Sequence, residues 1–103
     1  MILVTGSVQG TANTIDELTA ISLDHVCRSR TEPGCISHDV HHHVEERHRL
    51  VFVEQWADMA ALKTHFAVPE SIAFARALAA LGEGDPRIAI FDATAIPFAL
   101  GKG

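Results

Sequence analysis

The segment His48–Trp56, with the sequence HRLVFVEQW, decides the fold of this chain. Its branched and aromatic residues favour a β-strand. Side chains alternate between the two faces of a strand, so Leu50 and Phe52 share one face while Val51 and Val53 share the other. Because both faces are apolar, each of them must be covered by another layer of protein.

The segments on either side of this strand complete a βαββαβ order. We predict strands over Ile2–Gln9, over Cys35–Val44 and from Arg87 to about Phe98, and helices from Thr14 to about Arg30, over Met59–Phe66 and from Pro69 to about Leu81. Thr14 and Glu17 have the spacing of a capping box, and Asp58 precedes a helix that it can cap. This order predicts the α+β class and a ferredoxin-like fold, in which a four-stranded antiparallel sheet carries its helices on one face.

The second face of this sheet has no covering element within the chain. The length of 103 residues allows one domain, residues 1–103 with a core over about 2–98, and its helices cover one face only. The segment Ile88–Phe91 is, like residues 50–53, apolar on both faces. We therefore expect a homodimer in which the open faces of two sheets pack together.

Charge and hydropathy exclude several classes of partner. Eight basic and thirteen acidic residues give a net charge of -5, which disfavours nucleic acid as the main partner. No apolar run approaches the roughly 18 residues that a membrane span needs. The N-terminal residues MILVT lack the basic region of a signal peptide, so we expect a cytoplasmic protein without membrane partners.

Five of the seven histidines gather in one short segment, at His38, His41, His42, His43 and His48. On a strand, His41 and His43 would share a face with Asp39, and two histidines with one carboxylate can bind a metal. These residues lie beside a predicted hairpin tip at 44–47, where solvated polar side chains are the ordinary state. We therefore predict no metal site here.

Motifs for cofactors and nucleophiles are missing from the sequence. It contains no Gly-x-Gly-x-x-Gly, no phosphate-binding loop and no Gly-x-Ser-x-Gly, so no nucleotide or flavin cofactor is expected. Cys27 and Cys35 are too few for a disulfide framework. We expect them to be small buried side chains in a reduced compartment, because no motif around them indicates a Cys–His nucleophile.

A crevice between the sheet and the helices is the natural place for a site. Trp56, the single tryptophan, shares a strand face with Phe52 and Glu54, and His65 lies on the helix that follows. Trp56 can be a pocket wall or simply part of the core. For His65, a histidine that only suits the end of a helix is the alternative to a functional role.

Three stretches carry a resemblance to a known family. They are RSRTEPGC at Arg28–Cys35 with Asp39-Val40 after it, VEQWAD at Val53–Asp58, and AALKTHF at Ala60–Phe66 followed by Pro69 and Phe74. In this order and at these spacings, over about residues 2–98, the chain resembles the antibiotic biosynthesis monooxygenase domain family, whose members form dimeric α/β barrels.

The resemblance implies a homodimer with a pocket in each subunit and no metal or flavin. Characterised relatives oxidise quinol- or anthrone-type aromatics with O₂, so the implied partner is a small aromatic substrate whose carbanion reduces O₂ directly. His65 would be the acid or base and Trp56 a pocket wall, with His38 at a strand position usually held by Tyr. These three are the predicted catalytic residues, and the predicted pocket residues are Phe52, Glu54, Phe66 and Phe74.

Other functions remain open on the same scaffold. The haem-degrading members resemble this chain at Trp56 and His65, but they use an Asn on the first strand, which here reads Leu3-Val4-Thr5-Gly6-Ser7. An isomerase member and a dimeric module that binds a small ligand without turnover are the further alternatives.

Overall fold

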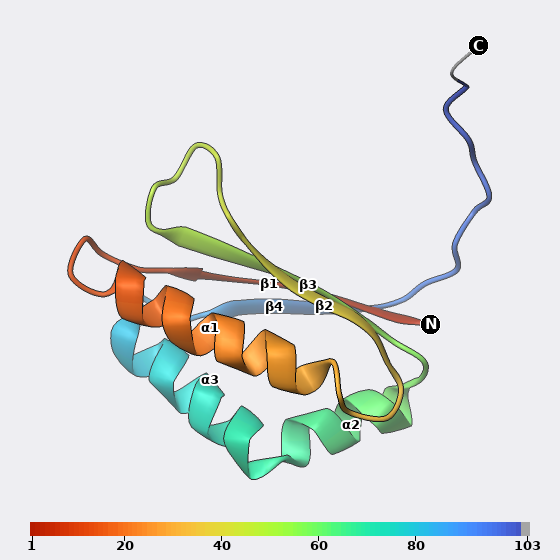
Figure 1. Cartoon of the computed structure of the whole chain (residues 1–103), viewed down its shortest axis with the longest axis horizontal. Helices are drawn as coiled ribbons and strands as arrows, with labels where there is room; N and C mark the ends of the chain where they lie inside the picture. The colour runs from red at the N-terminus through yellow and green to blue at the C-terminus, as the bar shows by residue number, and fades with distance from the viewer. Residues whose placement is uncertain (102–103) are drawn as a thin grey trace.

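The computed structural model describes residues 1–101 and contains a single four-stranded sheet. Its elements in chain order are β1 (Ile2–Gln9), α1 (Ile15–Ser29), β2 (Cys35–His42), β3 (Arg49–Trp56), α2 (Met59–Ala67), α3 (Pro69–Leu81) and β4 (Arg87–Asp92). The strands lie in the order β2-β3-β1-β4, and every pairing is antiparallel. All three helices lie on one side of the sheet, which confirms the predicted ferredoxin-like α+β fold (Figure 1).

The two faces of β3 differ in what covers them. Leu50, Phe52 and Trp56 point toward the helices and are buried, together with Glu54. Trp56 joins Val4 and Leu62 in one apolar cluster, whereas Leu50 and Phe52 belong to a second cluster with residues of α1 and α3. Val51 and Val53 pair with Ser7 and Thr5 on the face without helices. The helix-facing side of the sheet is therefore the side on which a buried site can form.

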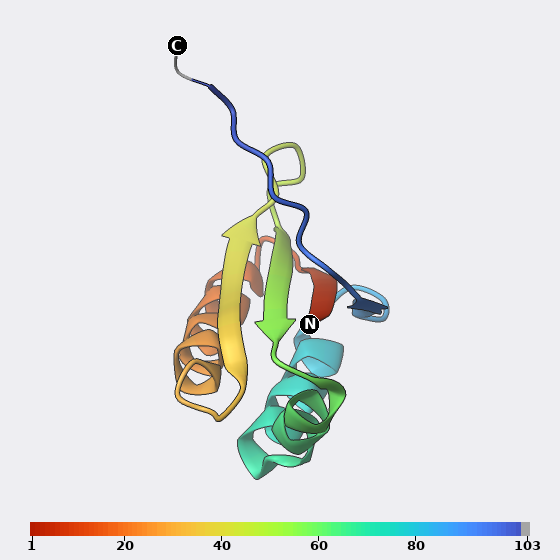
Figure 2. The same cartoon turned by 90° about the vertical axis from the view of Figure 1, so that its right-hand side faces the viewer.

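The fourth strand is shorter than predicted. It ends at Asp92 rather than near Phe98, and residues 93–101 continue as an extended segment away from the sheet (Figure 2). Asp92 pairs with Ile2, and the last ladder contact joins Ala93 N to Met1 O. Because β1 begins there, the described chain offers no further strand with which residues 93–98 could pair.

Local predictions at the helix starts had mixed outcomes. Asp58 caps α2 as predicted, because its carboxylate accepts a hydrogen bond from Ala61 N at 2.8 Å. The predicted capping box on α1 is wrong: Thr14 Oγ1 instead accepts from Thr11 N at 2.9 Å, and it caps no N–H within the described helix.

The cysteines also depart from the prediction, since Cys27 is exposed and Cys35 is half-buried, both as free thiols. Cys27 lies on the outer side of α1, where helical periodicity turns it away from the sheet. No helix within residues 1–101 has both the length and the apolar character that crossing a membrane requires.

Candidate functional site

A cavity of about 210 Å³ lies between the sheet and the helices α2 and α3. Phe52 of β3, Phe66 of α2 and Phe74 of α3 form its aromatic wall, and the polar residues His25, Glu54 and His65 also line it. Five predicted site residues therefore line one cavity, namely Phe52, Glu54, His65, Phe66 and Phe74. Trp56 and His38 are not among the lining residues and lie behind it, fully buried.

Gly6 keeps part of this cavity open. It lies on β1 opposite Phe52, with its α-carbon facing the helices. A β-carbon at this position would lie 3.2 Å from the backbone oxygen of Arg87 and 3.8 Å from Cβ of Phe52. A side chain here would therefore occupy space that now belongs to the cavity.

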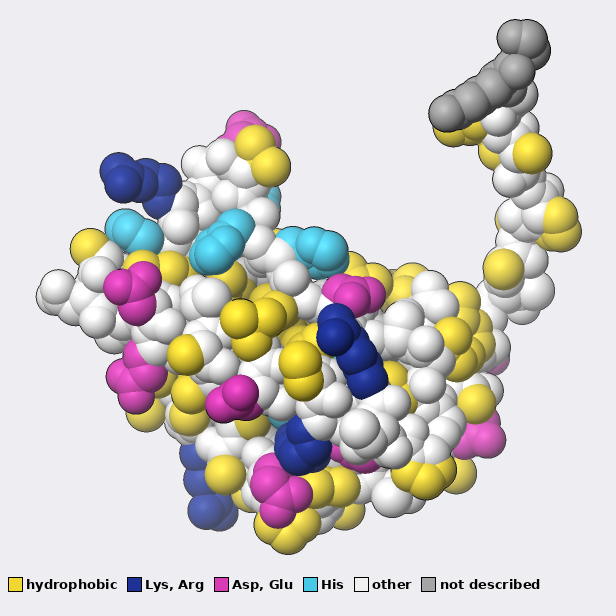
Figure 3. Space-filling view, in the orientation of Figure 1, with side chains coloured by type: hydrophobic (Ala, Val, Ile, Leu, Met, Phe, Trp, Pro, Cys, Tyr) yellow, Lys and Arg dark blue, Asp and Glu magenta, His cyan; other side chains and the backbone are white. Residues whose placement is uncertain are grey.

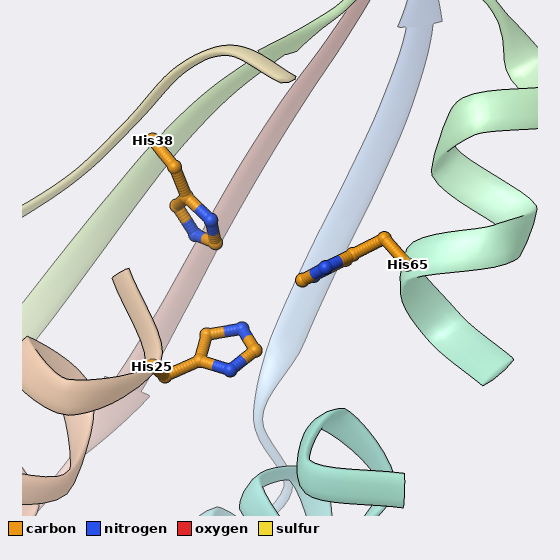
Figure 4. A group of neighbouring side chains, drawn as sticks. All are labelled: His25, His38 and His65. Atoms are coloured by element: carbon orange, nitrogen blue, oxygen red, sulfur yellow. The ribbon is translucent and has the colours of Figure 1, made fainter. Parts of the chain in front are cut away.

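Three histidines from three different elements meet beside the cavity, where His25 and His65 line it and His38 lies behind them. His25 comes from α1, His38 from β2 and His65 from α2, and their rings face a common space (Figure 4). The ring centroids are separated by 5.2 Å for His25 and His38, 5.1 Å for His25 and His65, and 5.8 Å for His38 and His65. All three side chains are buried, with exposed fractions of 7%, 1% and 2% respectively.

The turn between α1 and β2 places Glu32 beside His65. Gly34 has φ +84°, which a residue with a side chain rarely adopts, and a β-carbon there would lie 2.5 Å from Cβ of Ala61. Glycine therefore lets α2 approach the turn closely. With α2 this close to the turn, Glu32 Oε1 lies 2.9 Å from Nδ1 of His65.

The hydrogen bonds around Glu32 and Arg28 fix the protons of two imidazoles. A carboxylate only accepts, so Nδ1 of His65 donates to Glu32, and in the neutral ring the lone pair is then on Nε2. Arg28 Nη1 donates to Glu32 Oε2 at 2.9 Å, and Arg28 Nη2 donates to Nδ1 of His25 at 2.8 Å. Burial, with the neighbouring His38, His65 and Arg28, lowers the pKa of His25 from 6.5 to about 3. His25 is therefore neutral and carries its proton on Nε2.

Glu54 joins the third histidine to the tryptophan. Trp56 Nε1 donates to Glu54 Oε1 at 2.9 Å, and Nε2 of His38 lies 3.5 Å from Glu54 Oε2. Burial raises the pKa of Glu54 although the Trp56 hydrogen bond opposes this shift. Burial and the neighbouring His65 lower the pKa of His38 to about 4, so its ring is neutral. Among residues 1–101, Nδ1 of His38 has no hydrogen-bond partner.

This arrangement combines a proton acceptor with a proton donor at an apolar cavity. The lone pair on Nε2 of His65 can take a proton from a bound hydroxyl. The N–H on Nε2 of His25 can stabilise the negative charge that such a step creates. The aromatic wall offers an apolar surface against which a substrate ring can pack.

Sequence reasoning missed His25, Arg28 and Glu32 as parts of the site. His25 belongs to the inward stripe of α1, where Leu18, Ser22, His25 and Ser29 are all buried. The helical spacing of His25 from Leu18 and Ser29 is the signal in the sequence that could have identified it as inward-facing. His41 and His42 are exposed near the β2–β3 hairpin, where surface histidines gather in Figure 3.

Comparisons with known proteins agree with this fold. Residues 1–77 match the family described as "Antibiotic biosynthesis monooxygenase". An uncharacterized protein of Synechocystis sp. is 35% identical over 68 residues, which are 66% of this chain and 46% of that protein. The chain thus spans about half the length of that relative.

Solved structures show the same likeness. A Deinococcus radiodurans protein assigned as an antibiotic biosynthesis monooxygenase superposes with a TM-score of 0.92 at 23% identity, over 98% of this chain and all (100%) of that one. A Pseudomonas aeruginosa protein, PA3566, gives a TM-score of 0.81 at 26% identity, over 91% of this chain and 94% of that one. At 23% identity, the similarity to the Deinococcus protein shows the fold and nothing about activity.

Proposed function

Because the chain belongs to the antibiotic biosynthesis monooxygenase family, we propose that it oxidises a small aromatic quinol with O₂ without a metal or flavin. The observation that carries this proposal is the hydrogen-bond geometry of two buried imidazoles at one aromatic cavity, which favours opposite tautomers for the two rings. His65 offers a lone pair because Glu32 holds its other nitrogen, and His25 offers an N–H because Arg28 holds its other nitrogen. A quinol hydroxyl presents the complementary chemistry.

Cavity size restricts the substrate. An apolar cavity of about 150 Å³ accommodates benzene, and the present cavity measures about 210 Å³. A one-ring quinol or a compact two-ring quinol matches this volume better than a three-ring anthrone. A tetrapyrrole is larger still, which disfavours haem as the substrate.

The proposed reaction begins with proton transfer from the quinol hydroxyl to Nε2 of His65. The N–H of His25 stabilises the resulting oxyanion, and the electron-rich ring carbon attacks O₂ to form a carbon–oxygen bond. The peroxide anion takes the proton from His65 and becomes a hydroperoxide. The C–H proton on the same carbon then passes to Nε2 of His65 while the O–O bond breaks and a C=O bond forms, and the leaving hydroxide takes that proton and departs as water. One oxygen atom stays on the substrate, the other leaves as water, and the substrate is the only reductant.

Oxygen uptake tests the proposal. Protein treated with a chelator is assayed with benzoquinols, naphthoquinols and one anthrone, and we expect uptake above autoxidation for the smaller substrates. His65→Gln should lower kcat by about 10²- to 10⁴-fold, the usual contribution of general base catalysis. Lys63→Gln, on the exposed side of the same helix, is the matched control and should leave kcat unchanged. Uptake no faster than autoxidation across the panel would overturn the proposal.

A substitution at Gly6 tests the cavity itself. Gly6→Ala places a methyl group in the cavity near Phe52, so KM should rise more for a two-ring quinol than for a one-ring quinol. Equal KM values in the variant and the wild type for both substrates would show that the substrate binds elsewhere.

A further inference from the structure

We propose that His25, His38 and His65 form a binding site for one divalent transition-metal ion, for which zinc fits best. This inference goes beyond the proposed function and does not depend on it. One nitrogen from each ring lies within 4.8 Å of the others, and this is the one such group among residues 1–101. The rings reach the common space from α1, β2 and α2 (Figure 4).

Two of the three imidazoles already present a lone pair. Nδ1 of His65 donates to Glu32, which leaves Nε2 as a ligand atom, and a carboxylate behind a histidine is the usual support of a metal ligand. Nε2 of His38 faces Glu54, and Nδ1 of His38 is a buried nitrogen without a partner in the described chain. An unpaired buried polar atom is costly, and a bound metal ion would give this nitrogen a partner.

Charge and donor type favour a cation such as zinc. Glu32 lies beside His65 and Glu54 beside His38. Two cations are also close, because Arg28 donates to His25 and Arg30 donates to the backbone oxygen of His38 at 3.0 Å. Imidazole ligands suit zinc, copper, iron and nickel, and three histidines with an open position form a common zinc site. Zinc–nitrogen bonds of about 2.0–2.1 Å place tetrahedral ligands roughly 3.3 Å apart. The rings must therefore close inward from separations of up to 4.8 Å.

Arg28 opposes this closure. Its Nη2 donates to Nδ1 of His25, so a metal bound to that nitrogen displaces Arg28 directly. A metal bound to Nε2 of His25 moves the proton to Nδ1, which then faces another donor. The Arg28–His25 contact is lost in either case, while Glu32 and Ser71 remain as partners of Arg28. Arg28 thus weakens metal binding, whereas Glu32 strengthens it.

The first experiment counts zinc in the full chain after chelator treatment. The surface histidines also bind zinc adventitiously, so the protein tested carries His41→Ala, His42→Ala, His43→Ala and His48→Ala. Equilibrium dialysis should find one zinc per chain in this variant, and zinc should raise its Tm because only the folded state holds the site. Loss of stoichiometric zinc in this variant would overturn the inference.

The second experiment compares substitutions with opposite expected signs in the same background. Glu32→Gln should weaken zinc binding by about 10- to 100-fold. Arg28→Gln should strengthen it by about tenfold or more, since a charged hydrogen bond that competes with the metal is removed. His25→Gln should abolish stoichiometric binding. If these residues only supported the fold, all three substitutions would weaken zinc binding. Zinc binding by Arg28→Gln that is unchanged or weaker therefore contradicts the inference. This comparison holds even if His25→Gln fails to fold.

Metal binding and the base role of His65 exclude each other, because both use the lone pair on Nε2. One equivalent of zinc should therefore suppress oxygen uptake, and a chelator should restore it. The zinc titration contains no substrate. Loss of oxygen uptake with every quinol would overturn only the proposed function, whereas loss of stoichiometric zinc would overturn only this inference.

Discussion

His65, Glu32, Arg28 and His25 form one continuous chain of hydrogen bonds, and the chemistry of its two middle members orients both ends. Arginine only donates, and a carboxylate only accepts. Glu32 therefore selects the tautomer of His65, and Arg28 selects the opposite tautomer of His25. Lysine in place of Arg28 would be a poor substitute. The two guanidinium nitrogens of Arg28 donate separately to Glu32 and His25, and a single ammonium nitrogen cannot occupy both positions.

The buried histidines predict a loss of stability in mild acid. The pKa values of His25 and His38 are about 3 and about 4 in the folded chain, against 6.5 in the unfolded chain. Below pH 6.5 these histidines bind protons in the unfolded chain but stay neutral in the folded chain. The stability that the two neutral histidines contribute is therefore complete above pH 6.5 and declines as the pH falls toward 4 and then 3. The free energy of unfolding, measured with urea on chelator-treated protein, should fall by a few kcal/mol between about pH 7.5 and about pH 4.5.

The double variant His25→Gln/His38→Gln is the control for this pH dependence. Burial raises the pKa of Glu54, so that carboxyl contributes with the opposite sign as pH falls. The variant keeps Glu54 and removes the two histidines, and its stability should therefore change less between the same pH values. A wild type whose stability is as flat as that of the variant would contradict the assignment of neutral buried histidines.

At the scale of elements, the turn that joins α1 to β2 controls where α2 lies. Gly34→Ala introduces strain at φ +84° and brings a β-carbon within 2.5 Å of Ala61. Left-handed backbone costs about 1–2 kcal/mol and overpacking about 1–3 kcal/mol. Chemical denaturation should show a loss of about 2–5 kcal/mol in the free energy of unfolding. The kcat should also fall, because a displaced α2 moves His65 away from Glu32.

A second substitution separates these two effects. Gly34→Ala/Ala61→Gly removes the close contact but keeps the positive φ, so it should recover kcat more fully than it recovers the free energy of unfolding. If the double variant recovers neither quantity relative to Gly34→Ala, the contact between the turn and α2 does not position His65.

At the scale of the whole molecule, the sheet face opposite the helices is the surface that needs a partner. Leu3 of β1, Val51 and Val53 of β3, and Ala89 and Phe91 of β4 share this face, as the strand registers require. None of these apolar residues is fully buried, and Phe91 is 49% exposed. We propose that two copies of the chain cover these faces mutually, because an apolar face of this kind is an aggregation hazard in a monomer.

A charge in this face should separate the two copies. Val53→Asp buries an unpaired carboxylate in the proposed interface, so the dimer Kd should rise by roughly 100-fold or more. Val44→Asp is the matched control, because Val44 is 99% exposed between β2 and β3 and should leave the Kd unchanged. Sedimentation velocity over a concentration series measures both. A folded Val53→Asp variant with the dimer affinity of the wild type would refute packing of sheet against sheet.

Local patterns were sufficient to predict the elements and their order. The alternation in residues 50–56 identified β3 and its two faces, and Asp58 marked the start of α2. The three family-like stretches directed attention to His65 and to the aromatic residues that line its cavity. These features depend on residues that are close in sequence or that share one face of one element. The periodicity and spacing of the sequence can therefore predict them.

Features that require elements from distant parts of the chain emerged only in three dimensions. The end of β4 depends on where β1 begins, and no pattern within residues 87–98 contains that information. His25, Arg28 and Glu32 gain their roles from the approach of α1, β2 and α2, which a glycine at position 34 permits. The tautomers of His25 and His65 are set by partners brought close by the fold. A hydrogen bond depends on the distance and direction between atoms and not on their separation in sequence.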